Sequence, residues 1–229
     1  MTSANVVSRE TWLTARRELL AEEKAFTAAR DALSAKRRRM PWVKVETDYA
    51  FDGPKGRASL AELFEGKSQL IVYHFMMGPD WKEGCKSCSF WADNFNGIVV
   101  HLKQRDVTLV AVSSAALEKI EAFRKRMGWI FPWVSSSGTS FNADIGVSPE
   151  PGRPFIYNYG REVTEMDELP GISVFARDAA GNVYHTYSCY SRGLDMLNGA
   201  YHYLDLVPKG RDEDGLRFTM EWVKHHDRY

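Results

Sequence analysis

The chain has 229 residues, and its 30 lysines and arginines balance its 30 aspartates and glutamates. A formal net charge of zero provides no overall field that would draw the protein to nucleic acid or to an acidic membrane. The longest apolar run is far shorter than the ~20 residues that a membrane-spanning helix needs. The first twenty residues also lack the apolar core of a signal peptide. We therefore expect a cytoplasmic protein.

A long N-terminal helix is predicted from Ser8 to about Ala35. Its apolar and small side chains recur on one helical stripe, and Ser8 is a suitable N-cap. Pro41 then interrupts the helical pattern. We expect a helical extension over residues 1–40, followed by one larger domain over residues 41–208.

The first half of that domain alternates between strand and helix patterns. The run from Leu70 to Met76 has no polar alternation, which is typical of a parallel strand covered on both faces. Strands joined by helices indicate an α/β fold with helices on both faces of the sheet. The predicted elements are a strand at 49–51, helical turns at 59–64, strands at 70–76 and 107–112, and helices at 88–102 and 117–127.

The second half of the chain is less regular. Residues 133–160 have no clear period and are predicted to form a loop insertion that acts as a lid or a partner surface. A hairpin is expected over 172–187 and a last helix over 194–204. The tail over 209–229 contains tryptophan and tyrosine, so we expect it to dock on this chain or, in a homodimer, on a second copy.

The sequence Gly84-Cys85-Lys86-Ser87-Cys88 lies between the buried strand and the helix that follows it. A helix N-terminus carries unpaired N–H groups and a partial positive charge, which favour a thiolate. The helical spacing places Cys88 on the core-facing stripe and leaves Cys85 more exposed. A close cysteine pair in a reducing compartment is more often catalytic or metal-binding than structural.

Several blocks of the sequence resemble known proteins. Residues 80–88 resemble the Trp-x-x-x-Cys-x-x-Cys active site of thioredoxins, and the order of elements matches the thioredoxin fold. More closely, nearly the whole chain resembles the bacterial thioredoxin-like proteins called domain of unknown function 899, which are described as predicted dithiol-disulfide oxidoreductases. The blocks that carry this second resemblance are 40–42, 73–81, 85–95, 132–136 and 197–205.

The resemblance implies a thioredoxin-like fold, with a central mixed sheet and helices on both faces, and a role for each site residue. Cys85 matches the attacking cysteine and Cys88 the resolving cysteine. Pro170 matches the proline that thioredoxins hold in cis, where a substrate chain pairs as a short strand. Trp81 and Lys86 are predicted to lie at the substrate-binding rim.

The expected partners are a disulfide-containing protein or a small thiol, and an unidentified reductant. We expect no organic cofactor and no metal. Lys86 and Ser87 stand between the cysteines where thioredoxin has Gly-Pro. Because the intervening residues influence the stability of the thiolate, the reduction potential of thioredoxin cannot be assigned to this dithiol.

Four alternatives remain open. Cys85 and Cys88 could bind zinc together with His185 and Cys189, although almost a hundred residues separate the two pairs. Cys85 could reduce peroxides through a sulfenic acid, although Gly78 and Lys82 stand where peroxiredoxins have proline and threonine. The chain could instead be a non-catalytic binding or redox-sensing module. His74 could relay a proton, although one histidine inside a buried strand is more often a neutral core residue.

Overall fold

The structure is a computed structural model, which describes residues 5–163 and 165–229. It divides into two units, Met1–Pro41 and Trp42–Tyr229. The first unit contains the helix α1, Arg9–Arg37, which confirms the predicted N-terminal helix. Ser8 is its N-cap, and the Ser8 hydroxyl accepts a hydrogen bond from the Thr11 N–H at 3.1 Å. No described residue of α1 is buried.

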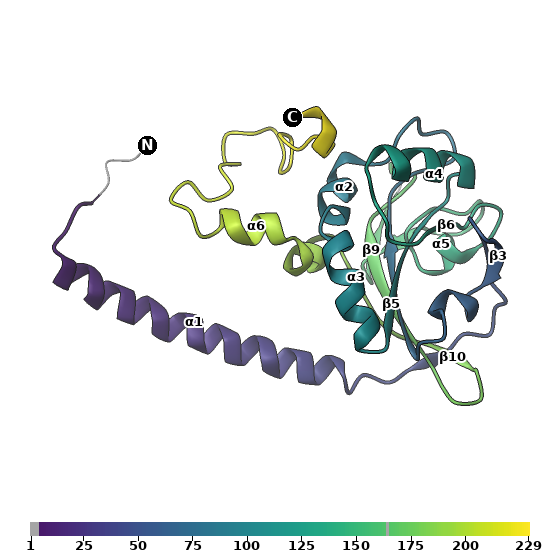
Figure 1. Cartoon of the computed structure of the whole chain (residues 1–229), viewed down its shortest axis with the longest axis horizontal. Helices are drawn as coiled ribbons and strands as arrows, with labels where there is room; N and C mark the ends of the chain where they lie inside the picture. The colour runs from purple at the N-terminus through teal and green to yellow at the C-terminus, as the bar shows by residue number, and fades with distance from the viewer. Residues whose placement is uncertain (1–4, 164) are drawn as a thin grey trace. The chain divides into compact units, whose positions relative to one another are not determined.

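The second unit is built on an eight-stranded sheet in the order β1-β10-β9-β4-β5-β6-β2-β3. At its centre, β4 pairs in parallel with β5 and antiparallel with β9, and β9 pairs with β10. This is the mixed thioredoxin-like sheet that the sequence predicts (Figure 1). The strands are β1 (Val43–Lys44), β2 (Ala50–Gly53), β3 (Gly56–Ser59), β4 (Gln69–His74), β5 (Val107–Ser113), β6 (Trp133–Ser135), β9 (Gly171–Arg177) and β10 (Val183–Tyr190).

Helices connect and cover these strands (Figure 1). The predicted helix over 88–102 is divided in two, because the chain turns at Asp93 and Asn94. The α-helices of this unit are α2 (Lys86–Ala92), α3 (Phe95–Gln104), α4 (Leu117–Arg126), α5 (Phe141–Asp144) and α6 (Gly199–Leu204), and the 3-10 helices are η1 (Glu62–Phe64), η2 (Ser191–Leu197) and η3 (His226–Arg228).

Alternate side chains of the central strands enter two separate cores. Tyr73 of β4 packs with residues of α2, α3 and α4 on one face of the sheet. Val72 of β4 packs with residues of η1, α5 and the β2–β3 hairpin on the other face. Both faces are therefore covered, as the continuous apolar pattern of this strand predicts.

Residues 133–160 differ in part from the predicted loop. Trp133–Ser135 form β6 and pair in parallel with β5. After α5, residues 145–163 and 165–170 belong to an excursion that contains the small sheet of β7 (Ile156–Tyr157) and β8 (Arg161–Glu162). The prediction was wrong for β6, because a three-residue strand is too short to show a period.

A buried carboxyl group joins this excursion to the sheet. Glu168 is only 3 % exposed, and it accepts hydrogen bonds from Ser114, which follows β5, and from Ser148 at 3.0 Å. Burial raises the pKa of Glu168 to about 7, although the two hydroxyl donors act in the opposite direction.

Glu168 predicts a pH-dependent stability. The pKa of Glu168 is higher in the folded than in the unfolded protein. Its contribution to the unfolding free energy is therefore complete below the pKa of the unfolded state and is lost as the pH rises through about 7. From about pH 5 to about pH 8 the wild type should lose about 2 kcal/mol of unfolding free energy relative to Glu168→Gln, which does not ionise. Urea unfolding of both proteins across this range measures the difference. A constant difference would contradict the raised pKa.

Candidate functional site

The two cysteines lie where the central strand passes into α2. The backbone of Met76, two residues beyond β4, contacts both of them. Its carbonyl oxygen accepts a hydrogen bond from the Cys85 N–H at 3.0 Å, and its N–H donates to the Cys88 Sγ at 3.5 Å. Both cysteines are free thiols; Cys85 is half-buried and Cys88 is 2 % exposed. The predicted order of exposure is confirmed.

Gly84 allows the chain to approach the core just before the dithiol. A Cβ atom at this position would lie 2.7 Å from the ring of Phe75 and 2.6 Å from the ring of Phe123. Any larger residue would displace one of these buried rings or the backbone that leads into Cys85. Packing against the two aromatic rings therefore requires glycine here.

Hydrogen bonds favour the thiolate at Cys85. The side chain of Cys88 makes the largest contribution, and the N–H groups of Cys88 and Ser87 add to it at the start of α2. Together they outweigh burial and lower the pKa of Cys85 to about 6. The lowered pKa favours the thiolate form of Cys85 at neutral pH.

Cys88 has the opposite tendency. Burial raises the pKa of its thiol well above the ordinary value, and the neighbouring charge of Cys85 raises it further. The hydroxyl of Tyr73 hydrogen-bonds to Cys88 and acts in the other direction, as does the N–H of Met76. The two thiols are thus distinguished by their surroundings.

Tyr73 is a site residue that the sequence reasoning missed. It lies on β4, it is 1 % exposed, and its hydroxyl contacts the buried thiol. Inside a continuous apolar strand it looks like a core residue. The only indication in the sequence is that a buried tyrosine hydroxyl needs a hydrogen-bond partner.

The structure places the remaining predicted site residues around the dithiol with different contacts. Trp81 is half-buried, and its ring lies against Gly78, where a Cβ atom would be 3.0 Å from the indole. The ammonium group of Lys86 donates to the carbonyl oxygen of Glu221 at 2.9 Å. Lys86 is therefore held by the C-terminal tail. The hydrogen bonds from Cys88 and Ser87 account for the lowered pKa of Cys85.

The expected cis peptide bond before Pro170 is not present in the structure. None of the described peptide bonds is cis, so the bond that precedes Pro170 is trans. Two hydrogen bonds with earlier residues of the excursion hold the segment that contains Pro170. The Leu169 N–H donates to the Val147 oxygen at 2.8 Å, and the Tyr157 hydroxyl donates to the Pro170 oxygen at 2.6 Å. The trans form is the lower in energy for X–Pro bonds by about 0.5–1 kcal/mol, and these contacts are made with it.

His74 lies on the other side of the sheet from the dithiol. It stacks near Phe141, which belongs to the core of that face, and its Nε2 hydrogen-bonds to the Ser173 hydroxyl at 2.8 Å. Burial lowers the pKa of His74 to about 3, so the ring is neutral. These contacts favour the core role over a proton relay to the cysteines.

The structure does not bring the four predicted zinc ligands, Cys85, Cys88, His185 and Cys189, together as a metal site. In the part of the chain that the structure describes, no three His, Cys, Asp or Glu side chains are placed to hold a metal ion. His185 hydrogen-bonds instead to the Ser188 hydroxyl at 2.7 Å, and Cys189 is half-buried against the core that contains Cys88.

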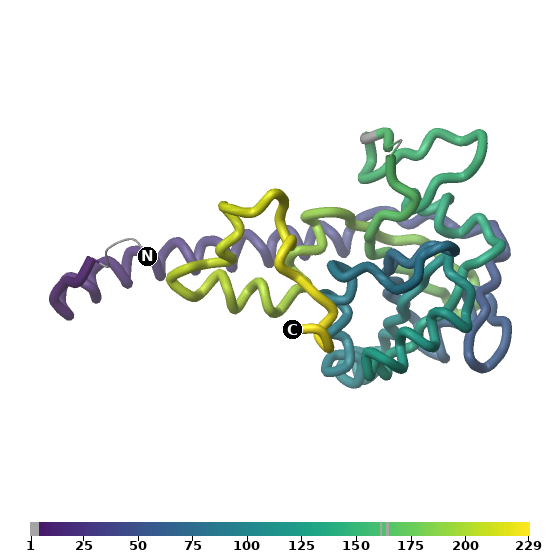
Figure 2. The backbone as a smooth tube through the Cα atoms, turned by 90° about the horizontal axis from the view of Figure 1, so that it is seen from above, coloured from purple at the N-terminus to yellow at the C-terminus, as the bar shows by residue number. Residues whose placement is uncertain are grey.

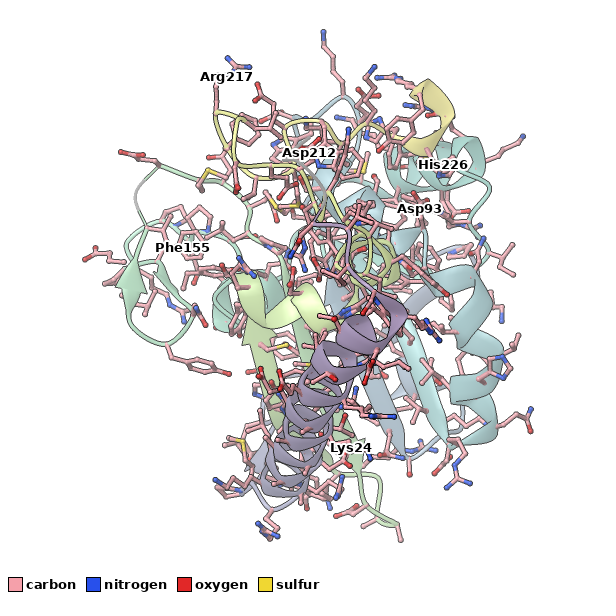
Figure 3. All side chains as sticks on the ribbon, turned by 90° about the vertical axis from the view of Figure 1, so that its left-hand side faces the viewer. Lys24, Asp93, Phe155, Asp212, Arg217 and His226 are labelled. Carbon is pink, nitrogen blue, oxygen red and sulfur yellow. The ribbon has the colours of Figure 1, made fainter. Side chains whose placement is uncertain are left out.

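The predicted docking of the tail occurs on this chain. Figure 2 shows the C-terminal segment returning to the core beside the segment that carries α2. Its contacts surround the dithiol, and the pair of Asp93 and His226 is labelled in Figure 3. The polar contacts are His225 to the Gly84 oxygen (2.9 Å), Arg228 to Glu83 (2.8 Å), Asp227 to Arg126 (2.8 Å) and His226 to Asp93 (2.6 Å).

The family model described as "Bacterial protein of unknown function (DUF899)" matches residues 1–229. The chain belongs to this family. No curated protein matches the sequence. None of the helices in the described residues is long and apolar enough to cross a membrane.

Among solved structures, the chain is similar to the peroxidoxin BcpB from Mycobacterium tuberculosis, with 15 % identity over 69 % of this chain and 93 % of that chain, and a TM-score of 0.48. It is also similar to peroxiredoxin Q from Xanthomonas campestris, with 13 % identity over 70 % of this chain and 95 % of that chain, and a TM-score of 0.48.

The lowered pKa of Cys85 predicts the pH dependence of its alkylation. In a Cys189→Ser background, the rate with iodoacetamide should follow a midpoint near 6, against roughly 8.5 for a free cysteine. Replacing Cys88 by alanine removes the largest cause and should move the midpoint upward. Replacement by serine keeps a hydroxyl donor and should move it less. Equal midpoints in all three proteins would contradict the assigned cause.

Proposed function

We propose that this protein is a dithiol-disulfide oxidoreductase in which Cys85 attacks and Cys88 resolves. The observation that carries the proposal is the opposite tuning of two adjacent thiols, one half-buried with a pKa of about 6 and one buried with a raised pKa. A nucleophile must be ionised and reachable, whereas a resolving thiol must react only after the first step.

The reaction balances on these two residues. The Cys85 thiolate attacks one sulfur of a substrate disulfide, and the S–S bond breaks to release one substrate thiolate. Cys88 loses its proton, attacks the Cys85 sulfur, and releases the second substrate thiolate. Two electrons pass from the dithiol to the substrate, and a separate reductant must then restore the Cys85–Cys88 dithiol.

The surroundings of Cys88 support the second step. Once Cys85 is in a mixed disulfide it carries no charge, so the repulsion that raises the pKa of Cys88 is removed. The Tyr73 hydroxyl and the Met76 N–H then remain as donors to the forming thiolate. Tyr73 thus acts as a catalytic residue that contacts the reacting sulfur.

The first test traps the intermediate. A Cys88→Ser, Cys189→Ser variant should accumulate a mixed disulfide at Cys85 when a disulfide substrate is supplied, because the resolving thiol is missing. Intact-mass measurement detects the adduct, and Cys85→Ser, Cys189→Ser is the matched control. Absence of an adduct, together with ordinary alkylation of Cys85, would refute the proposal. Peroxide consumption without disulfide exchange would favour the peroxidase alternative.

A second test addresses Tyr73. Tyr73→Phe removes the hydrogen bond to Cys88, and a bond to a charged group contributes about 1.5–3 kcal/mol, so resolution of the mixed disulfide should slow by at least about tenfold. Rapid-quench measurement of the intermediate reports this step. The alkylation profile of Cys85 should remain close to that of the wild type. Tyr203→Phe, at an exposed tyrosine, is the control; equal decay in both variants would exclude the role.

A further inference from the structure

A cavity of about 880 Å³ opens at the start of α2, where Ser87 and Cys88 line it. Its inner wall contains Tyr73, Cys88 and Pro170, and its outer wall is made by residues 205–220 of the C-terminal region. Asp212, on that outer wall, is labelled in Figure 3. Sites for small molecules typically have volumes of about 300–1,000 Å³. The space is therefore suited to a molecule of a few hundred daltons.

The outer wall is fixed to the rest of the domain. Glu213 accepts hydrogen bonds from the Tyr201 hydroxyl at 2.8 Å and from the Trp222 indole at 2.7 Å. Arg211 binds Asp195 of η2 at 2.9 Å and Asp205 at 2.7 Å. Beyond the cavity, the contact of Lys86 with the Glu221 oxygen attaches the tail to α2 itself. Residues of the tail thus form a fixed part of the cavity wall.

The backbone groups beside Pro170 that would pair with a peptide substrate already make hydrogen bonds within this chain. Adding a substrate strand beside Pro170 needs free backbone N–H and C=O groups. The Leu169 N–H donates to Val147, and the Pro170 oxygen accepts from Tyr157. Both partners belong to the excursion over 145–170. A polypeptide would have to displace these contacts before it could pair there.

We infer that the substrate of the dithiol is a low-molecular-weight disulfide that binds in this cavity, rather than a disulfide of a folded protein. This inference rests on the proposed function and assigns its substrate class. The lining carries side chains of both charges, so a polar disulfide with amino and carboxylate groups fits better than an apolar one. Arg211, Asp195, Asp205 and Glu213 already contact one another or other side chains, and the further charged lining residues include Asp212, Asp214 and Lys209.

The experiment compares two disulfides on the full-length protein. Oxidised glutathione is the small polar probe, and insulin is the protein probe. The second-order rate of dithiol oxidation by each is divided by the rate of dithiothreitol with the same disulfide, which removes differences in intrinsic reactivity. We expect the normalised rate with oxidised glutathione to exceed that with insulin by at least about tenfold, a difference of about 1.4 kcal/mol in transition-state free energy.

A cavity-filling variant tests the binding site. Thr219 lines the cavity, so Thr219→Trp should lower the rate with oxidised glutathione by about tenfold and leave the alkylation profile of Cys85 unchanged. Lys224→Trp is the matched control, because Lys224 is an exposed tail residue outside the cavity. Lys224→Trp should leave both the rate with oxidised glutathione and the alkylation profile of Cys85 unchanged.

The outcomes separate this inference from the proposed function. Equal or faster normalised reaction with insulin would overturn the small-disulfide inference while leaving the oxidoreductase proposal in place. An unchanged rate with oxidised glutathione in Thr219→Trp would also overturn it. Absence of exchange with either disulfide in the wild type, together with ordinary alkylation of Cys85, would overturn both.

Discussion

The geometry of the dithiol depends on the backbone of one residue, Met76. Its carbonyl oxygen binds the Cys85 N–H and its N–H binds the Cys88 Sγ. Met76 follows β4 almost directly, and β4 is paired along its length with β5 and β9. These two hydrogen bonds therefore tie both cysteines to the end of β4, across the segment over 75–85 that forms neither helix nor strand.

The same constraint separates the chemistry of the two thiols. Cys85 lies at the edge of the core, where the N–H groups of Ser87 and Cys88 are available. Cys88, one helical turn later, enters the core and is only 2 % exposed. A difference of three residues at a helix start thus produces one ionised thiol and one neutral thiol. Gly84 permits this arrangement, because the chain passes close to two buried aromatic rings.

The sequence predicted the parts of the site that depend on local patterns. The buried strand, the helix start and the unequal exposure of Cys85 and Cys88 follow from hydrophobic periodicity and from the position of the dithiol. The strand β6 and the trans bond before Pro170 depend on contacts with distant residues, such as the hydrogen bond from Tyr157 to Pro170. Local composition contains no information about such contacts.

For the C-terminal tail, the sequence predicted docking but not the surface on which the tail docks. Its tryptophan and tyrosine indicated docking, but the surface that receives it is formed by polar groups with no common pattern, such as Glu83 and Asp93. Ion pairs of this kind are weak individually at an exposed surface. Here they accompany the buried side chains of Val223 and His225, which provide the apolar contact that keeps the tail in place.

A tyrosine beside Cys88 has an electrostatic consequence. A buried carboxylate at this position would add a second negative charge near Cys85 and would raise the pKa values of both thiols. The Tyr73 hydroxyl is neutral, because burial raises its own pKa well above the ordinary value. It therefore donates a hydrogen bond to Cys88 without opposing the charge on Cys85. The surroundings can therefore keep Cys85 ionised while a hydrogen-bond donor remains next to Cys88.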